Sequence, residues 1–196
     1  MTEFRSPGSR RFRGPNSVSS ASRAVSAVAE RATRPRVAAV IGWVAVIVVA
    51  DQLTKSWIVA HLGDGHSIDV VGSFVQLSLT RNSGAAFSRF QGLTPLLAVV
   101  AIVIAVVLVR VLRRTTDTVM VVALVLVLGG ALGNLADRVF RAPGVLRGHV
   151  VDFVKVGSFP LFNLADSCIT VGAILLAVRS VQLDRAPRDE PETAGE

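Results

Sequence analysis

The chain alternates between long apolar runs and shorter polar segments. Four runs are long and apolar enough to cross a bilayer, at residues 37–60, 94–112, 118–136 and 161–181. Between the first two runs, the stretch SFVQLSLT at residues 73–80 alternates apolar with polar side chains, which is typical of an amphipathic strand. We therefore predict an all-α membrane protein with four transmembrane helices and a small extracytoplasmic β-sheet between helices 1 and 2.

The composition agrees with a membrane protein. Of the 196 residues, 51% are hydrophobic, and the mean hydropathy is +0.56, which is too apolar for an ordinary water-soluble domain. The single cysteine, Cys168, excludes an intramolecular disulfide and a cysteine-based zinc site. We interpret Cys168 as a small packing residue.

Basic residues indicate the orientation of the chain. Eight of the 21 Lys and Arg residues precede Val37, in a tail rich in Ser, Arg, Pro and Gly. This composition predicts disordered cytoplasmic tails at residues 1–36 and 183–196, on either side of a membrane domain at 37–182. With the N-terminus inside, 14 basic residues lie on the cytoplasmic side and seven outside, so both termini are expected in the cytoplasm. A basic tail that adjoins an apolar run is an anchor flank, and no nucleic-acid partner is expected.

Ionisable residues within spanning segments are rare and often mark a functional site. Asp51 and Lys55 lie one helical turn apart near the outer end of the first helix, where a structural ion pair and a direct role are both possible. The third helix ends with Asn134 and Asp137, three residues apart and therefore on one face. Next to them, glycines at 129, 130 and 133 allow close approach of neighbouring helices.

A second Asn and Asp pair occurs at the start of the fourth helix. Asn163 and Asp166 are again three residues apart, and Asp152 lies just before that helix in a polar loop. Taken singly, the asparagines could only bridge helices, and Asp137 could only pair with Arg138 at the interface. The four carboxylates nevertheless share one depth near the outer side, which independent structural pairs have no reason to do.

Five motifs carry a resemblance to a known family. DQLTK at 51–55, NSGAAF at 82–87, GNLADR at 133–138, VVDF at 150–153 and FNLAD at 162–166 resemble, in the same order, the motifs of the lipoprotein signal peptidase (signal peptidase II) family. The resemblance covers residues 37–182. The loop RAPGVLRGH before VVDF is longer than expected and could move Asp152 relative to the helix.

The resemblance implies an aspartic endopeptidase of the bacterial cytoplasmic membrane, which cleaves prolipoproteins before a diacylglyceryl-modified cysteine near the outer face. The family's catalytic pair falls on Asp152 and Asp166, which would share one proton. The expected substrate-binding or supporting residues are Asn82, Asn134, Arg138, Asn163, Asp51, Lys55 and Asp137. We expect a monomer whose partners are diacylglyceryl-modified prolipoproteins and membrane lipids.

Other classes of protein fit the sequence less well. A proton- or cation-coupled transporter also uses buried carboxylates, but it needs polar residues through the full depth of the membrane, and the inner halves of helices 1 to 3 are nearly all apolar. No His-Glu-x-x-His motif is present, and the three histidines lack ligand spacing, so we expect no metal and no cofactor. A scaffold protein remains the other alternative, and carboxylate substitution would distinguish it.

Overall fold

The structure is a computed structural model that describes residues 16–84 and 94–185, with side chains described from residue 37 onward. It contains four helices and three strands within these ranges: α1 (Asn16–His61), β1 (Ser67–Val71), β2 (Val75–Asn82), α2 (Thr94–Arg114), α3 (Thr118–Phe140), β3 (Val150–Val156) and α4 (Leu164–Arg185). The chain divides into two units, residues 1–40 and 41–196, and the candidate site lies in the second.

The four predicted transmembrane helices are confirmed. Val37–His61 within α1, and the whole of α2, α3 and α4, are long and apolar enough to cross a membrane. Large apolar side chains cover their outer surfaces, with Trp43 64% exposed and Leu96 54% exposed. Such an exposed apolar surface is stable in lipid and would favour aggregation in water.

The first helix begins earlier than the sequence predicts. α1 starts at Asn16, although residues 16–36 belong to the predicted disordered tail. This segment is rich in Ala and Arg, which favour helix even without an apolar face to bury. The segment therefore differs from the prediction, while residues 1–15 and 186–196 lie outside the described residues.

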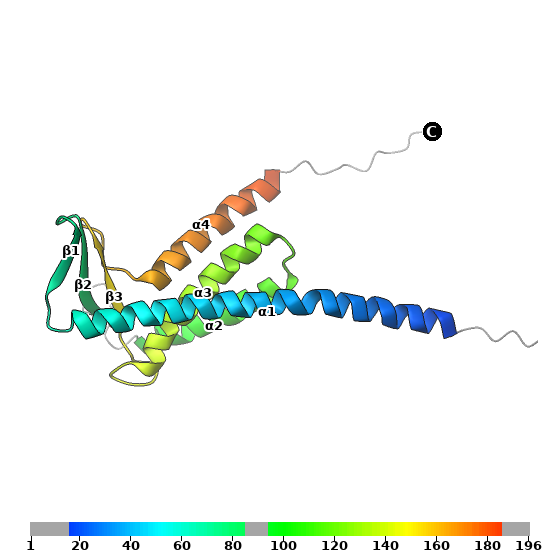
Figure 1. Cartoon of the computed structure of the whole chain (residues 1–196), viewed down its shortest axis with the longest axis horizontal. Helices are drawn as coiled ribbons and strands as arrows, with labels where there is room; N and C mark the ends of the chain where they lie inside the picture. Colours follow the sequence, from blue (N-terminus) through cyan, green and yellow to red (C-terminus); the bar gives the residue numbers. More distant parts are fainter. Residues whose placement is uncertain (1–15, 85–93, 186–196) are drawn as a thin grey trace, which may run out of the picture. The chain divides into compact units, whose positions relative to one another are not determined.

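The small sheet is confirmed, and it has an additional strand. The three strands form an antiparallel sheet in the order β1-β2-β3, at the end of the helices where α1 ends and α4 begins (Figure 1). β1 and β2 lie between α1 and α2 as predicted, but β3 follows α3, in a segment that we expected to be a loop. The prediction that Asp152 lies in a loop is therefore wrong.

One face of the sheet packs on the last turns of α1. Ile58 of α1 and Leu62, which directly follows α1, form a buried cluster with Val151 and Phe153 of β3, and Leu77 of β2 packs against it. Because successive strand residues point to opposite faces, Asp152 faces away from this cluster. The hydrophobic contact thus fixes the direction in which the carboxylate of Asp152 points.

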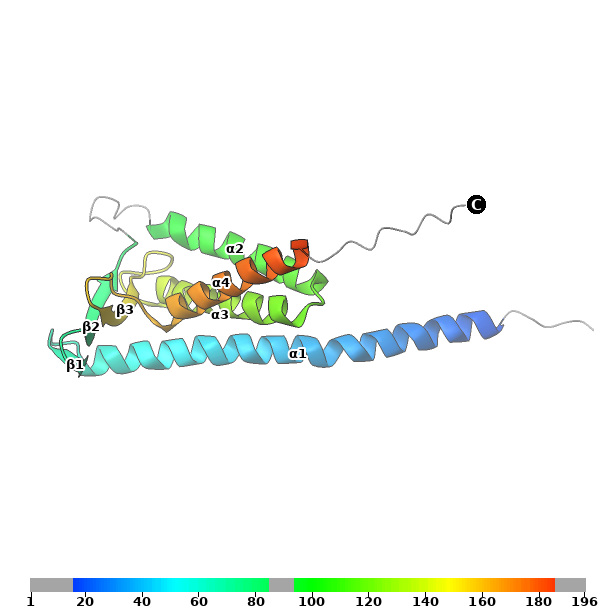
Figure 2. The ribbon, with the colours of Figure 1, turned by 90° about the horizontal axis from the view of Figure 1, so that it is seen from above.

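Helix α3 is the centre of the helical packing. It contacts both α2 and α4 (Figure 2). A Cβ atom at Gly130 would overlap the main-chain oxygen of Ala165, and one at Gly133 would lie 2.8 Å from Asp51 Oδ2. The predicted close approach at these glycines is confirmed, since any larger residue would push α1 or α4 away.

Candidate active site

Asp152 and Asp166 lie on different elements and are bridged by one residue. Asp152 is on β3, and Asp166 is in the first turn of α4. The Asn163 side chain donates through Nδ2 to Asp152 Oδ1 at 2.7 Å, and its main-chain N–H donates to Asp166 Oδ2 at 3.2 Å. Both carboxylates are thus within hydrogen-bond reach of a single asparagine.

The start of α4 brings Asp166 to this position. Asn163 Oδ1 accepts from the Asp166 main-chain N–H at 2.9 Å, and the reciprocal bond to Asp166 Oδ2 completes a capping box. Just before the cap, Phe162 pairs with Val154 of β3 through main-chain hydrogen bonds of 2.8 and 3.1 Å. Helix α4 therefore begins at Leu164, three residues after the approximate boundary predicted at residue 161, because Phe162 pairs with the strand.

Sheet pairing and a carboxylate of α3 fix Asp152. On the neighbouring strand, Asn82 Nδ2 donates to Asp152 Oδ2 at 2.9 Å. Asp137 Oδ2 accepts from the main-chain N–H of Val151 at 3.1 Å and so anchors β3 to the end of α3. Asn82 is thus in contact with Asp152, while residues 85–87 of the NSGAAF motif lie outside the described residues.

The long loop between α3 and β3 does not displace Asp152. Gly148 donates its main-chain N–H to the Arg138 oxygen at 3.0 Å, which holds the loop against the end of α3. A Cβ atom at Gly148 would overlap the Asp137 main-chain oxygen, so only glycine fits this close approach. β3 begins at Val150, two residues after this anchored point.

The environment of Asp152 favours its protonated form. Burial raises the pKa of the Asp152 carboxyl, because an ionised carboxylate loses hydration there, and the nearby Asp166 raises it further. Hydrogen bonds from Asn82 and Asn163 act in the opposite direction. This is the behaviour expected of one member of a carboxylate pair that shares a proton.

Behind the two carboxylates lies a buried ion cluster. The fully buried Lys55 ammonium lies 2.8 Å from Asp51 Oδ2 and 2.9 Å from Asp137 Oδ2. Asp137 Oδ1 also accepts from Arg141 Nε at 2.5 Å. Two carboxylates therefore face two cations, which is the pairing that buried charges require. The predicted Asp51–Lys55 contact is present, and Asp137 pairs with Lys55 and Arg141 rather than with Arg138.

The cluster is connected to the carboxylate pair through an asparagine. Lys55 Nζ donates to Asn134 Oδ1 at 2.9 Å, and Asn134 Nδ2 donates to Asp166 Oδ1 at 2.8 Å. Because an ammonium group can only donate hydrogen bonds, the amide oxygen of Asn134 must face Lys55. The amide N–H₂ group of Asn134 then faces Asp166. Lys55 thereby sets the orientation of a side chain that touches Asp166.

Asp51 and Asp137 each hold one of the elements that carry the pair. Asp51 Oδ1 accepts the Ala165 N–H at 3.0 Å in the first turn of α4, and Asp137 accepts the Val151 N–H of β3.

Two members of this ion cluster were not predicted from the sequence. Gln52 donates to Asp137 Oδ1 at 3.1 Å and to the Gly133 oxygen at 3.1 Å, and Arg141 pairs with Asp137. The spacing of Asp137 and Arg141 by four residues was a detectable signal.

Arg138 is the predicted site residue that the hydrogen-bond network does not include. Its Nη1 atom is buried and has no hydrogen-bond partner among residues 16–84 and 94–185. It lies close enough to Asp152 and Asp166 to interact electrostatically, and a Cβ at Gly84 would lie 3.6 Å from both of its terminal nitrogens. A buried guanidinium donor without an acceptor is suited to binding a carbonyl oxygen from outside the protein.

The site contains no ligand set typical of a metal. Within the described parts of the chain, no group of three or more His, Cys, Asp or Glu side chains is placed to hold a metal ion. The carboxylates instead receive hydrogen bonds from asparagine side chains and main-chain N–H groups. The arrangement can hold a proton between two acids and orient a water molecule beside them.

The sequence is similar to those of lipoprotein signal peptidases. Residues 43–182 match the family described as Signal peptidase (SPase) II. Over 133 residues the chain is 52% identical to a lipoprotein signal peptidase of Rhodococcus jostii, an alignment that covers 68% of this chain and 67% of that one. Over 137 residues it is 45% identical to a lipoprotein signal peptidase of Mycobacterium leprae, covering 70% and 68%.

The fold also resembles solved structures. A bacterial membrane enzyme solved by the in meso method at 2.3 Å has a TM-score of 0.66 and 32% identity, and the match covers 78% of this chain and 93% of that chain. A second such enzyme, solved at 1.9 Å, has a TM-score of 0.65 and 34% identity, with coverages of 73% and 92%.

Proposed function

The chain belongs to the signal peptidase II family, and from this premise we propose that it is an aspartic endopeptidase that cleaves prolipoproteins within the membrane. Membership confirms the resemblance of the five sequence motifs. Family membership and the four apolar helices indicate a multi-pass protein of the bacterial inner membrane that removes signal peptides from lipoproteins. The chemistry, the catalytic residues and the orientation are our proposals.

In the proposed mechanism, Asp152 and Asp166 act as a catalytic pair that shares one proton. The ionised member removes a proton from a water molecule, which attacks the scissile carbonyl, and the protonated member donates to the carbonyl oxygen. The observation that carries this assignment is the bridge through Asn163, which bonds both carboxylates. Because two interacting carboxyl groups titrate as a unit, the shared proton belongs to the pair rather than to one residue.

The remaining predicted residues hold the pair or the substrate. Asn82, Asn134 and Asn163 orient the two carboxylates through the hydrogen bonds described above. The unpaired Nη1 of Arg138 is suited to a substrate main-chain carbonyl. Asp51, Lys55 and Asp137 act indirectly, by holding α4, Asn134 and β3 in place.

We propose that the lipid of the substrate brings the scissile bond to this site. Each buried methylene of an acyl chain contributes about 0.8 kcal/mol, so a diacylglyceryl group fixes its cysteine at the membrane boundary. Positioning of this kind supplies a large part of catalysis. The distribution of Lys and Arg favours both termini in the cytoplasm, and hence a site near the outer face. We further propose that residues 37–182 form the peptidase domain and act as a monomer among membrane lipids.

The test is incubation of the purified protein with a diacylglyceryl-modified prolipoprotein peptide. We expect a product shortened at the modified cysteine, and we expect Asp152→Asn and Asp166→Asn each to abolish it without loss of helicity by circular dichroism. Asp69→Asn is the control, since the exposed Asp69 lies on the same sheet and accepts a hydrogen bond from Gln76. Substantial cleavage by either well-folded site variant would exclude the aspartic pair.

A further inference from the structure

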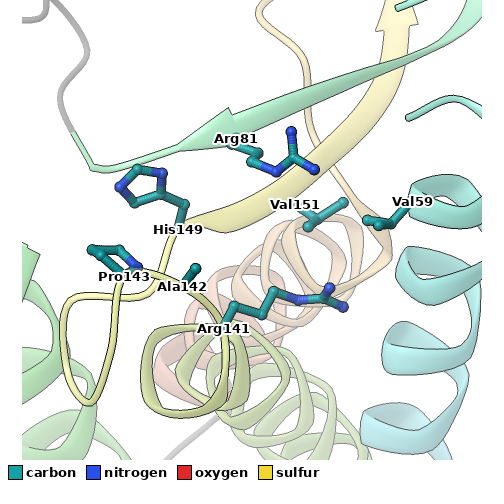
Figure 3. A pocket seen from close by; sticks show the side chains of 7 residues that line it. All are labelled: Val59, Arg81, Arg141, Ala142, Pro143, His149 and Val151. Carbon is teal, nitrogen blue, oxygen red and sulfur yellow. The ribbon is translucent and has the colours of Figure 1, made fainter. Parts of the chain in front are cut away.

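A cavity with basic residues in its lining lies on the side of the sheet away from the proposed catalytic pair. It has a volume of about 360 Å³, within the range of small-ligand pockets. Figure 3 shows Arg81 and Arg141 on opposite sides of it, with His149 at a third side. Val59 of α1 and Val151 of β3 contribute an apolar wall.

Strand geometry separates this cavity from the candidate active site. Arg81 pairs with Val151, and Asn82 pairs with Val150, in the register of β2 and β3. Because successive strand residues face opposite sides, Arg81 and Val151 face the cavity, whereas Asn82 turns to Asp152. The cavity therefore shares a sheet with the catalytic pair but not its face.

The cavity carries an excess of positive charge. Arg141 uses Nε to bind Asp137, and the pairs formed by Asp51, Asp137, Lys55 and Arg141 sum to zero charge. Among residues 37–84 and 94–185, none accepts a hydrogen bond from the Arg81 guanidinium, the His149 ring or the terminal nitrogens of Arg141. These donors line the cavity and have no acceptor in the described part of the chain, and clustered guanidinium groups are typical of phosphate sites.

The position of the cavity indicates the source of such an anion. Val59 lies two residues before the end of the first membrane span, and Arg141 directly follows the third. Exposed aromatic side chains lie at the same level, with Trp57 47% and Phe140 85% exposed, as is common at the boundary between membrane and water. Lipid headgroups occupy this level, and their phosphates are the most abundant anions there.

We propose that this cavity binds the phosphate of an anionic phospholipid headgroup. Arg81, Arg141 and His149 donate to the phosphate oxygens, while Val59 and Val151 contact the apolar part of the lipid next to them. The net positive charge selects a headgroup that is negative overall over one that is zwitterionic. This proposal concerns binding alone and does not depend on the peptidase activity.

The test uses the full chain, purified in detergent, and measures its melting temperature during titration with lipid. Phosphatidylglycerol is compared with phosphatidylcholine of the same acyl chains and with inorganic phosphate, since a ligand that binds the folded state raises the melting temperature. The variants are Arg81→Gln and His149→Gln, with Lys155→Gln as the control. Lys155 is a cation on the same sheet but does not line the cavity.

We expect phosphatidylglycerol to stabilise the wild type saturably, and phosphatidylcholine and inorganic phosphate to do so far less at equal concentration. Arg81→Gln and His149→Gln are expected to weaken the apparent affinity about fivefold each, and Lys155→Gln to leave it unchanged. Equal weakening by Lys155→Gln would show diffuse attraction and overturn the proposal. Equal stabilisation by inorganic phosphate would identify a small-anion site instead, and unchanged affinity in both cavity variants would exclude the cavity.

Discussion

Replacement of Lys55 by Met tests whether the buried ion cluster holds the site together. Lys55 is fully buried and contacts Asp51, Asp137 and Asn134. Without its ammonium, Asp137 still has Arg141 at 2.5 Å, but Asp51 retains only hydrogen bonds from Gln52 at 3.2 Å and the Ala165 N–H at 3.0 Å. The variant thus leaves one buried carboxylate without a cation.

The magnitude follows from that uncompensated charge. Removing one partner of a buried ion pair costs about 3–5 kcal/mol, and for a chain of this length each kcal/mol lowers the melting temperature by about 2–4 °C. We therefore expect Lys55→Met to melt roughly 6–20 °C below the wild type in detergent, followed by circular dichroism. Adding Asp51→Asn should recover part of this loss, because the new amide side chain keeps an oxygen for the Ala165 N–H and carries no charge.

A matched double variant tests whether Asp51 is the carboxylate that Lys55→Met leaves without a cation. Asp137→Asn in the Lys55→Met background should recover less than Asp51→Asn does, because it removes the partner of Arg141. Equal recovery, or none with Asp51→Asn, would show that Asp51 is not the uncompensated group. In the stabilised Asp51→Asn/Lys55→Met protein, cleavage should still be about 10- to 100-fold below wild type, because Asn134 has lost one of the two donors that orient it toward Asp166 and keeps only Asn163.

Four other outcomes follow from the structure. Asn82→Ala removes a hydrogen bond that lowers the pKa of Asp152, so the alkaline limb of the pH–rate profile should move to higher pH, while Gln76→Ala on the same strand leaves it in place. Gly130→Val places side-chain atoms against the Ala165 oxygen and should cost about 1–3 kcal/mol in thermal unfolding, where an unchanged melting temperature would contradict the close packing. EDTA should leave cleavage unchanged, and activity lost in EDTA and restored by zinc would indicate metal chemistry. A prolipoprotein with an unmodified cysteine should be cleaved at least about a hundredfold more slowly in liposomes, and equal rates would exclude lipid-based positioning.

The difference between β2 and β3 shows what the sequence could predict about the sheet. β2 is partly exposed, and its alternation of apolar and polar residues identified it as a strand. In β3, Val150, Val151, Asp152 and Phe153 are all buried, because α1 covers one face and the ends of α3 and α4 approach the other. A strand buried on both faces loses the alternation that identifies a strand, so its position could not be read from the pattern.

Polar residues near the helix ends made the predicted helix boundaries inaccurate. Asp137 and Arg138 follow the apolar part of the third span, so a hydropathy boundary falls near residue 136, yet α3 continues to Phe140 because Asp137 is paired inside the protein. In the same way, the stretch LFNLA at 161–165 resembles the start of an apolar helix, although Phe162 pairs with β3 and Asn163 caps α4. Local composition cannot distinguish a polar residue that ends a helix from one that is bonded to a distant partner.

Charge balance supports a role for Arg138 in the proposed mechanism, beside a cluster that is already neutral. The charges of Asp51, Asp137, Lys55 and Arg141 cancel one another, so these residues position the proposed catalytic pair without adding net charge. A pair of acids that shares one proton carries one negative charge, and in a buried site that charge requires a counter-charge. Arg138 lies within electrostatic range of both acids while its Nη1 stays without a partner in the described chain. The same guanidinium can therefore balance the pair and still present a donor to a substrate carbonyl, which a second carboxylate partner would have prevented.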